Sequence, residues 1–159
     1  MVAAPRRCAA GESWEWDGVR FEFLNPLPDR PAKRNDLSCV LRIATPRGAA
    51  LLTGDIERAG ESALLSSSLK SDVLLVPHHG SRTSSTPEFI AAVAPRWAVV
   101  AAGYRNRFGH PNREVLERYR AARAEVVRTD LDGAVSFFLA DSGISVVSER
   151  SRRGRYWLQ

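Results

Sequence analysis

The sequence predicts one α/β domain, a mixed β-sheet of about eight strands with about three helices. Apolar runs of strand length alternate with amphipathic segments along the 159 residues, without an internal repeat or a linker. The composition is 44% hydrophobic and 26% charged, which is typical of a globular domain with one core and excludes disorder and collagen. No apolar run reaches the length of about 18 residues that a membrane span needs, so we expect no membrane insertion by this chain.

The first third of the chain predicts strands joined by turns. Residues 19–26 alternate apolar and polar side chains like a half-exposed strand, and a proline-rich loop over 27–36 follows. Residues 38–45 and 49–55 are two further strands. Because the turn-forming residues 46–48 separate them, we expect a hairpin.

The middle of the chain alternates helices with buried strands. A weak amphipathic helix over 56–68 precedes the apolar run 72–80, which is typical of a strand covered on both faces. Thr86 as a capping residue and Pro87 at the first helical position then start a helix. Residues 96–103 predict a second fully buried strand.

The last third predicts one helix and three closing strands. The loop YRNRFGHP precedes a helix over 112–124, whose apolar residues lie on one face. The segment GHP at 109–111 has two interpretations, a helix entry in which proline fixes the first turn, or part of a functional site. The closing strands are expected at 124–130, 133–140 and 143–149.

The chain is basic, with a net charge of +5 and a pI near 9.9, and nearly all of the positive charge is arginine. This permits a polyanionic partner, although a biased genome composition also produces arginine-rich proteins. The basic aromatic tail at 150–159 ends in Tyr156, Trp157, Leu158 and Gln159. The tail either clamps phosphates while an aromatic ring stacks on a base, or is solvated.

Two cysteines, Cys8 and Cys39, can pair or stay free. They are too few for a disulfide framework or a thiolate metal site, and they leave the compartment open. The N-terminal segment lacks the apolar core of a signal peptide.

Candidate ligands follow the predicted strands, where open α/β sheets build their sites. Asp55 ends one strand, His78 and His79 end the next, and His110 follows a third. A carboxylate and an imidazole at neighbouring strand ends are suitable ligands for a divalent ion, although a lone histidine is more often structural. Adjacent histidines in an extended chain point to opposite sides, so only one of them can be a ligand unless the backbone turns there.

Four runs in this order, NDLSCVLRI, LLTGDIE, DVLLVPHHGSRTSS and AVVAAGYRNRFGHP, resemble the C-terminal half of the metallo-β-lactamase-like domain of the ComEC family. These competence proteins carry DNA across the bacterial inner membrane. The resemblance covers roughly residues 10–157. It implies half of an αββα sandwich in which loops at one edge of the sheets hold one or two metal ions.

The resemblance also implies roles for individual residues. Asp55 matches an aspartate that bridges two metals, His79 the last histidine ligand, and His78 a neighbour that meets the scissile phosphate. Asn35 and Ser38 match a polar pair that stands where other members of the superfamily place a histidine ligand.

The family's principal metal motif, HxDxDH, is absent from these residues. The resemblance implies that this motif and a membrane channel precede residue 1, and that residues 1–159 are the C-terminal part of the domain. We expect the complete domain to bind zinc or manganese. The isolated chain is then expected to bind metal weakly or not at all and to be inactive, since about three protein ligands are needed for a catalytic zinc site.

Three functions are compatible with this picture. The leading hypothesis is a metal-dependent nuclease that degrades the DNA strand that is not imported, with His78 catalytic. Ser81, Arg105, Asn106, Arg107 and His110 are then the candidate substrate- and phosphate-binding residues. The alternatives are a DNA-guiding module without catalysis, and a structural half-domain that folds only with its missing partner.

The strand order makes one geometric prediction about this site. The helix from Thr86 supplies the crossover that two parallel neighbours require, so strands 72–80 and 96–103 should run parallel. The loop 104–111 should then lie at the same edge of the sheet as Asp55 and His79.

Overall fold

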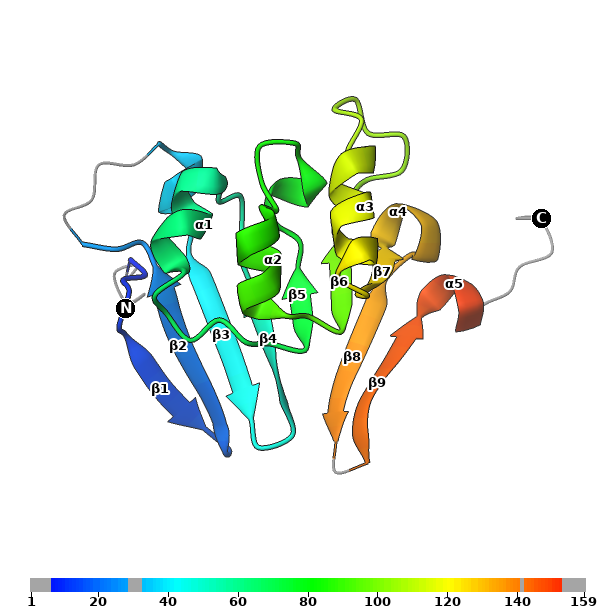
Figure 1. Cartoon of the computed structure of the whole chain (residues 1–159). Coiled ribbons are helices and arrows are strands. Elements are labelled where there is room, and N and C mark those ends of the chain that lie inside the picture. The colour runs from blue at the N-terminus through cyan, green and yellow to red at the C-terminus, as the bar shows by residue number, and fades with distance from the viewer. Residues whose placement is uncertain (1–6, 29–32, 141, 153–159) are drawn as a thin grey trace, which may run out of the picture.

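A seven-stranded sheet with helices on one face forms the centre of the α/β fold (Figure 1). The computed structural model describes residues 7–28, 33–140 and 142–152. The sheet strands are β1 Ser13–Trp16, β2 Val19–Asn25, β3 Val40–Thr45, β4 Gly48–Leu52, β5 Val73–Leu75, β6 Trp97–Val100 and β7 Glu125–Arg128. The helices are α1 Arg58–Leu64, α2 Pro87–Val93, α3 Arg113–Ala121 and the one-turn α4 Thr129–Asp132 and α5 Glu149–Arg152. Two 3-10 turns, η1 Asn35–Leu37 and η2 Pro77–Gly80, complete the elements together with a hairpin of β8 Val135–Ala140 and β9 Gly143–Ser148.

Strand order in the sheet follows the order in the sequence. Strands β1 to β4 pair antiparallel, whereas β4, β5, β6 and β7 pair parallel. The parallel strands are aligned, since Leu51 lies opposite Leu74, Leu74 opposite Ala98, and Ala98 opposite Val126. All parallel strands therefore end at one edge of the sheet.

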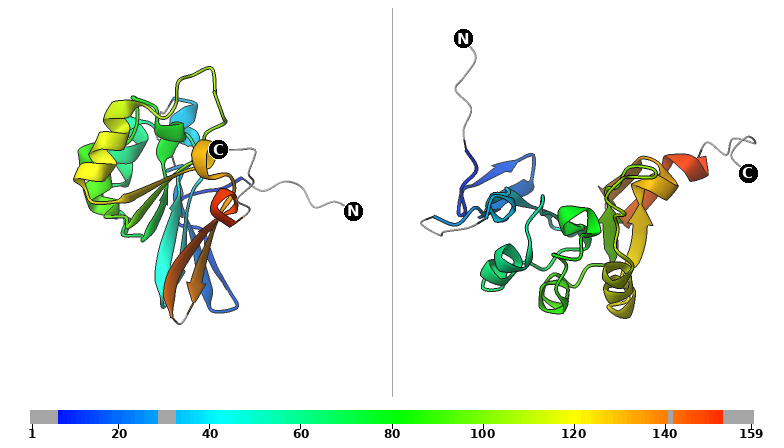
Figure 2. Two further views of the ribbon diagram at one scale, coloured as in Figure 1. Left: turned by 90° about the vertical axis from the view of Figure 1, so that its right-hand side faces the viewer. Right: turned by 90° about the horizontal axis from the view of Figure 1, so that it is seen from above.

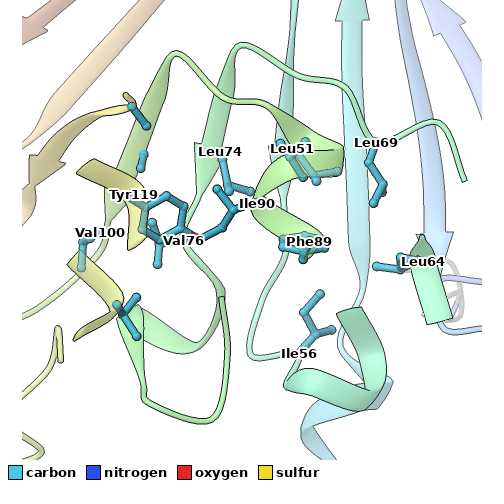
Figure 3. Packing of buried hydrophobic residues seen from close by; sticks show 14 of the residues in the cluster. Leu51, Ile56, Leu64, Leu69, Leu74, Val76, Phe89, Ile90, Val100 and Tyr119 are labelled. Atoms are coloured by element: carbon cyan, nitrogen blue, oxygen red, sulfur yellow. The ribbon is translucent and has the colours of Figure 1, made fainter. Parts of the chain in front are cut away.

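The main core lies between the sheet and the helices α1, α2 and α3. Leu51 and Leu74 on the strands are fully buried against Phe89 of α2, and Tyr119 of α3 closes the same cluster (Figure 3). Burial of such side chains stabilises the fold by about 1.5–3 kcal/mol each. Helix packing therefore holds one face of the sheet out of water.

The opposite face of the sheet is covered unevenly. Hairpin β8–β9 packs Phe137 and Ile144 against Trp97 and its neighbours on β5 to β7, on the side away from the helices (Figure 2). At the other end of the sheet, Trp14 of β1 is 44% exposed and Trp16 is 73% exposed. The β1 end therefore presents large aromatic side chains to solvent.

Most predicted elements are present, but both buried strands are shorter than expected. The run 72–80 is a strand only over Val73–Leu75, because the chain turns into η2. The run 96–103 is a strand only over Trp97–Val100, because the Ala102 N–H leaves the ladder and donates to Thr129 Oγ1 at 2.9 Å.

Other boundaries also differ from expectation. The β8–β9 hairpin forms a sheet of its own. Strand β1 and the one-turn helices were not predicted, because four residues are too few to establish a period. Helix α3 begins after Asn112, whose Oδ1 accepts a hydrogen bond from Glu114 N at 2.9 Å. Pro111 therefore lies before the cap and does not form the first turn, which corrects the helix-entry interpretation.

The predicted cap of α2 is confirmed. Thr86 Oγ1 accepts a hydrogen bond from Phe89 N at 3.3 Å, and Pro87 takes the first helical position. None of the helices in the described ranges has the length and apolar character needed to cross a bilayer. Residues 153–159 of the basic aromatic tail lie outside the described residues, and Arg150 and Arg152 belong to α5.

Cys8 and Cys39 form a disulfide, with 6.0 Å between their Cα atoms. The bond joins the segment before β1 to the residue directly before β3, two parts of the chain 31 residues apart. It therefore fixes the N-terminal segment beside residues 35–39.

Replacing both cysteines by serine should lower the free energy of unfolding by about 3–4 kcal/mol, because the disulfide restricts the unfolded chain. Urea denaturation followed by circular dichroism measures this value. A reductant should destabilise the natural protein by a similar amount and leave the double serine variant unchanged. Equal stability of the oxidised protein and the variant would contradict the prediction.

Candidate functional site

The aligned parallel strands bring Asp55 and all three histidines to one edge of the sheet. Asp55 follows β4, His78 and His79 follow β5, and His110 follows β6. The ring centre of His78 lies 6.5 Å from that of His79 and 6.0 Å from that of His110. The loop 104–111 therefore lies at the predicted edge, which confirms that geometric prediction.

His78 and His79 have left-handed backbone conformations, with φ of 48° and 55°. Such a conformation costs about 1–2 kcal/mol for each residue that has a Cβ atom. The chain turns at these residues and is not extended, so the expectation that only one histidine faces the site does not apply. Gly80 follows with φ of 79°, and a Cβ there would lie 2.7 Å from Pro111 Cβ. Close packing of this turn against the loop before α3 therefore requires glycine.

His79 presents one ring nitrogen towards Asp55. Its Nδ1 donates to the carbonyl oxygen of Ala101 at 2.7 Å, because a carbonyl can only accept. The Nε2 atom lies 3.5 Å from Asp55 Oδ1. In the neutral ring this Nε2 carries the free lone pair, which is the arrangement found in metal-binding histidines.

His78 contacts a carboxylate that sequence reasoning missed. Its Nδ1 lies 3.4 Å from Glu57 Oε1 and 3.4 Å from Thr83 Oγ1. Glu57 Oε1 also accepts hydrogen bonds from Thr83 Oγ1 at 3.1 Å and Asn35 Nδ2 at 3.3 Å. The predicted helix 56–68 includes Glu57, whereas in the structure Glu57 is the residue directly before α1. The signal in the sequence that could have identified Glu57 is its position, two residues after the predicted ligand Asp55.

The polar pair Asn35 and Ser38 lies against the backbone of Asp55. Ser38 Oγ donates to the carbonyl of Asn35 at 2.7 Å and accepts from Asp55 N at 3.1 Å. Between them, Asp36 is buried, and its Oδ1 accepts from the backbone N–H groups of Glu57 at 2.8 Å and Gly60 at 2.9 Å. These bonds hold the backbone of Asp55 and of Glu57, and so position the two carboxylates that contact the histidines.

A second buried carboxylate holds the loop after the histidines. Glu61 of α1 is fully buried and accepts hydrogen bonds from Thr86 N at 2.8 Å and from Ser85 N. Burial raises the pKa of Glu61, while hydrogen bonds from Thr86 and Ser85 and the charge of Arg118 act in the opposite direction. Tyr119 of α3 donates to Ser85 Oγ at 3.0 Å, so α1 and α3 both hold this loop.

The predicted substrate-binding residues differ in their availability. Ser81 is buried, and its hydroxyl lies 3.1 Å from Thr83 Oγ1. Asn106 uses its side chain within the loop, accepting from His110 N at 3.1 Å and donating to His110 O at 2.7 Å. Arg105 and Arg107 are the members of this set whose charged groups lie over exposed aromatic rings.

The described residues contain no group of three or more histidine, cysteine, aspartate or glutamate side chains arranged to hold a metal ion. Asp55 Oδ1 and His79 Nε2 are two ligand atoms of the right chemistry, whereas a zinc site takes about four ligands. This pair fits one side of a divalent-metal site that other residues would complete.

A cavity of about 670 Å³ adjoins the site on the side of α1. Glu57 and Thr83, which contact His78, also line this cavity. Three cationic residues, Lys33, Arg58 and Arg82, line it as well. Because the carboxylates of Asp36 and Glu57 line it too, the cavity places cationic and anionic groups beside the contacts of His78.

Comparison with known proteins relates the chain to competence proteins. It is 41% identical over 157 residues to "Competence protein ComA" of Neisseria gonorrhoeae, an alignment covering 97% of this chain and 22% of that protein. It is 36% identical over 129 residues to "ComE operon protein 3" of Bacillus subtilis, covering 80% of this chain and 17% of that protein. It is 31% identical over 145 residues to "Recombination protein 2" of Haemophilus influenzae, covering 91% of this chain and 18% of that protein. No protein-family model matches the chain.

The chain spans about a fifth of the length of these curated relatives, between 17% and 22%. Their similarity therefore concerns one segment of much longer proteins.

His110 should titrate below the ordinary histidine pKa of 6.5, because burial and the neighbouring charges of His78 and His79 lower its pKa. NMR of the imidazole protons over a pH series measures this value, and His78→Ala should raise it. A lowered pKa in the folded state means that His110 contributes stability above pH 6.5 that is lost as the pH falls through the lowered value. His110→Gln should therefore lose less stability on acidification. A midpoint at or above 6.5 would contradict this.

Proposed function

We propose that this relative of competence proteins is the C-terminal half of a metallo-β-lactamase-like domain, and that the complete domain hydrolyses DNA with the help of a divalent metal. The observation that carries the proposal is the convergence of Asp55, His79 and His78 after the two parallel strands β4 and β5, at one edge of the sheet. Carboxylate and imidazole ligands with a neighbouring proton carrier are suited to metal-assisted hydrolysis.

The shape of the sheet supports a half-sandwich. Helices cover one face of the sheet (Figure 2). Away from this helix-covered core, Trp14 is 44% exposed and Leu52 is 37% exposed. Exposed aromatic patches of this kind often mark contact surfaces. The missing half of the domain, which would carry the remaining metal ligands, and a membrane channel are the partners that this proposal assigns to the rest of a longer protein.

Asp55 Oδ1 and His79 Nε2 would hold the metal, zinc or manganese. The bound ion would polarise the phosphate and activate water for attack on phosphorus. The hydrogen bond from His79 Nδ1 to Ala101 keeps Nε2 free for this role.

The remaining residues of the site would bind the phosphate and move protons. Glu57 and Thr83 orient the His78 ring through Nδ1, so its other nitrogen can hold a proton for the leaving oxygen. Arg105 and Arg107 of the loop 104–111, and the cationic groups that line the cavity, would hold the flanking phosphates.

DNA uptake is the biological setting that the relatives' names support. Within it, we assign the domain to degradation of the strand that is not imported, in a protein of the bacterial inner membrane. The Cys8–Cys39 disulfide supports a position on the oxidising side of that membrane, since structural disulfides are rare in the cytosol.

A DNA-guiding module without catalysis is the second candidate. The net charge of +5 and the arginines of loop 104–111 favour it. Asp55 argues against it, because a carboxylate beside the DNA path repels phosphate unless a cation neutralises it.

A gel shift with single-stranded DNA in the presence of a chelator separates these two candidates. Binding by a guiding module should persist without divalent metal and weaken steeply with salt. If the domain is a metal-dependent nuclease, restoring metal to the complete protein should instead produce cleavage.

Asp55→Asn in the complete protein should lower metal-dependent DNA cleavage on the order of 100-fold or more without unfolding it, because it removes a charged ligand. Asp17→Asn, at the opposite end of the sheet, is the matched control.

The two histidines should separate on substitution. His79→Ala should lower metal occupancy, measured by elemental analysis, whereas His78→Ala should lower turnover with the metal retained. Equal metal loss from both histidine variants would contradict the assignment of metal binding to His79 and of catalysis to His78. Full activity of the Asp55→Asn variant would show that Asp55 is not a metal ligand.

A further inference from the structure

We propose that Tyr104 and Phe108 form a stacking platform for unpaired bases, so that the strand reaching the site is single-stranded. This inference rests on the proposed function for its DNA substrate and adds the form of that substrate. Tyr104 is 69% exposed and Phe108 is 66% exposed, although both rings are large and apolar enough to favour burial. Both lie in the loop between β6 and α3.

The platform is continuous with the histidine cluster. The Phe108 ring stacks on the His110 ring, with 6.0 Å between ring centres and 18° between ring planes. The His110 ring in turn lies 6.0 Å from that of His78. A base placed on Phe108 would thus lie beside the histidine that we assign to the scissile phosphate.

Each exposed ring has its own cation. The Arg105 guanidinium lies 5.2 Å from the ring centre of Tyr104, and that of Arg107 lies 4.9 Å from the ring centre of Phe108. Residues 101–111 include no aspartate or glutamate. A planar ring for the base and a cation for its phosphate are the two parts of a site for single-stranded nucleic acid.

The loop is held in shape before any ligand binds. Asn106 bridges it with hydrogen bonds to Gly103 O at 3.2 Å and to both backbone groups of His110. A loop held in this way loses little conformational freedom on binding, which favours affinity.

The geometry selects unpaired bases because the faces of paired bases are covered by their neighbours in the helix stack. Exposed aromatic rings bind such faces in single strands and loops, and sequence has little influence on this contact. Trp16 offers a contrast, since it is 73% exposed but lies between Glu15 and Asp17 at the opposite end of the sheet. Its two neighbours in the sequence are acidic, whereas Tyr104 and Phe108 each have an arginine as a neighbour.

Fluorescence anisotropy of the full chain in a chelator, with labelled oligothymidine and a blunt DNA duplex, tests the inference. The double variant Tyr104→Leu with Phe108→Leu should weaken binding of the single strand by about tenfold or more, because stacking contributes on that scale for each base. Binding of the duplex should change little. Trp16→Leu should leave both affinities unchanged, and thermal melting should show that all variants are folded.

Three outcomes would overturn the inference. Unchanged affinity of the double leucine variant for the single strand would show that the loop does not stack bases. An equal loss of affinity for the single strand and the duplex would show that the loop binds only phosphates. Binding of the natural chain to anionic vesicles but not to DNA would assign the aromatic loop to a membrane surface. Failure of the nuclease proposal would appear separately, as intact DNA in the metal-supplemented cleavage assay with single-strand binding retained.

Discussion

Parallel pairing of β4, β5 and β6 is the constraint on which the candidate site depends. Because these strands are aligned and run in one direction, the residues that follow them emerge together at one edge. Asp55, His78, His79 and His110 are separated by up to 55 positions in the chain, yet they form one cluster. A hydrophobic core between the sheet and three helices maintains that alignment.

Buried carboxylates hold the loops that carry the site. Asp36 fixes the backbone at Glu57, and Glu61 binds the backbone of Ser85 and Thr86. These bonds, with the packing of Gly80 on Pro111, hold the chain after η2 in place. These long-range contacts thus hold the segments on both sides of the turn in which His78 and His79 keep left-handed conformations.

Sequence patterns were informative where a local physical rule applies. The Thr86–Pro87 start of α2 and the turn between β3 and β4 were predicted because capping and turn chemistry depend on adjacent residues. The grouping of Asp55 with the histidines followed from strand order. Strand ends were less predictable. The apolar residues 73–76 favour a strand that continues, whereas Pro77 and the long-range contacts of Gly54 and Pro111 impose a turn.

The sequence by itself determined the α/β class, the parallel crossover and the residues able to act as ligands or phosphate-binding groups, since these depend on periodicity and residue chemistry. Tertiary structure alone decided which partners those residues have. It pairs Glu57 with His78, uses Asn106 inside its loop, buries Ser81 and joins Cys8 to Cys39. The contacts of Glu57 with His78 and of Cys8 with Cys39 join residues that are distant in the chain. Their distances follow from the packing of whole elements, which no local pattern records.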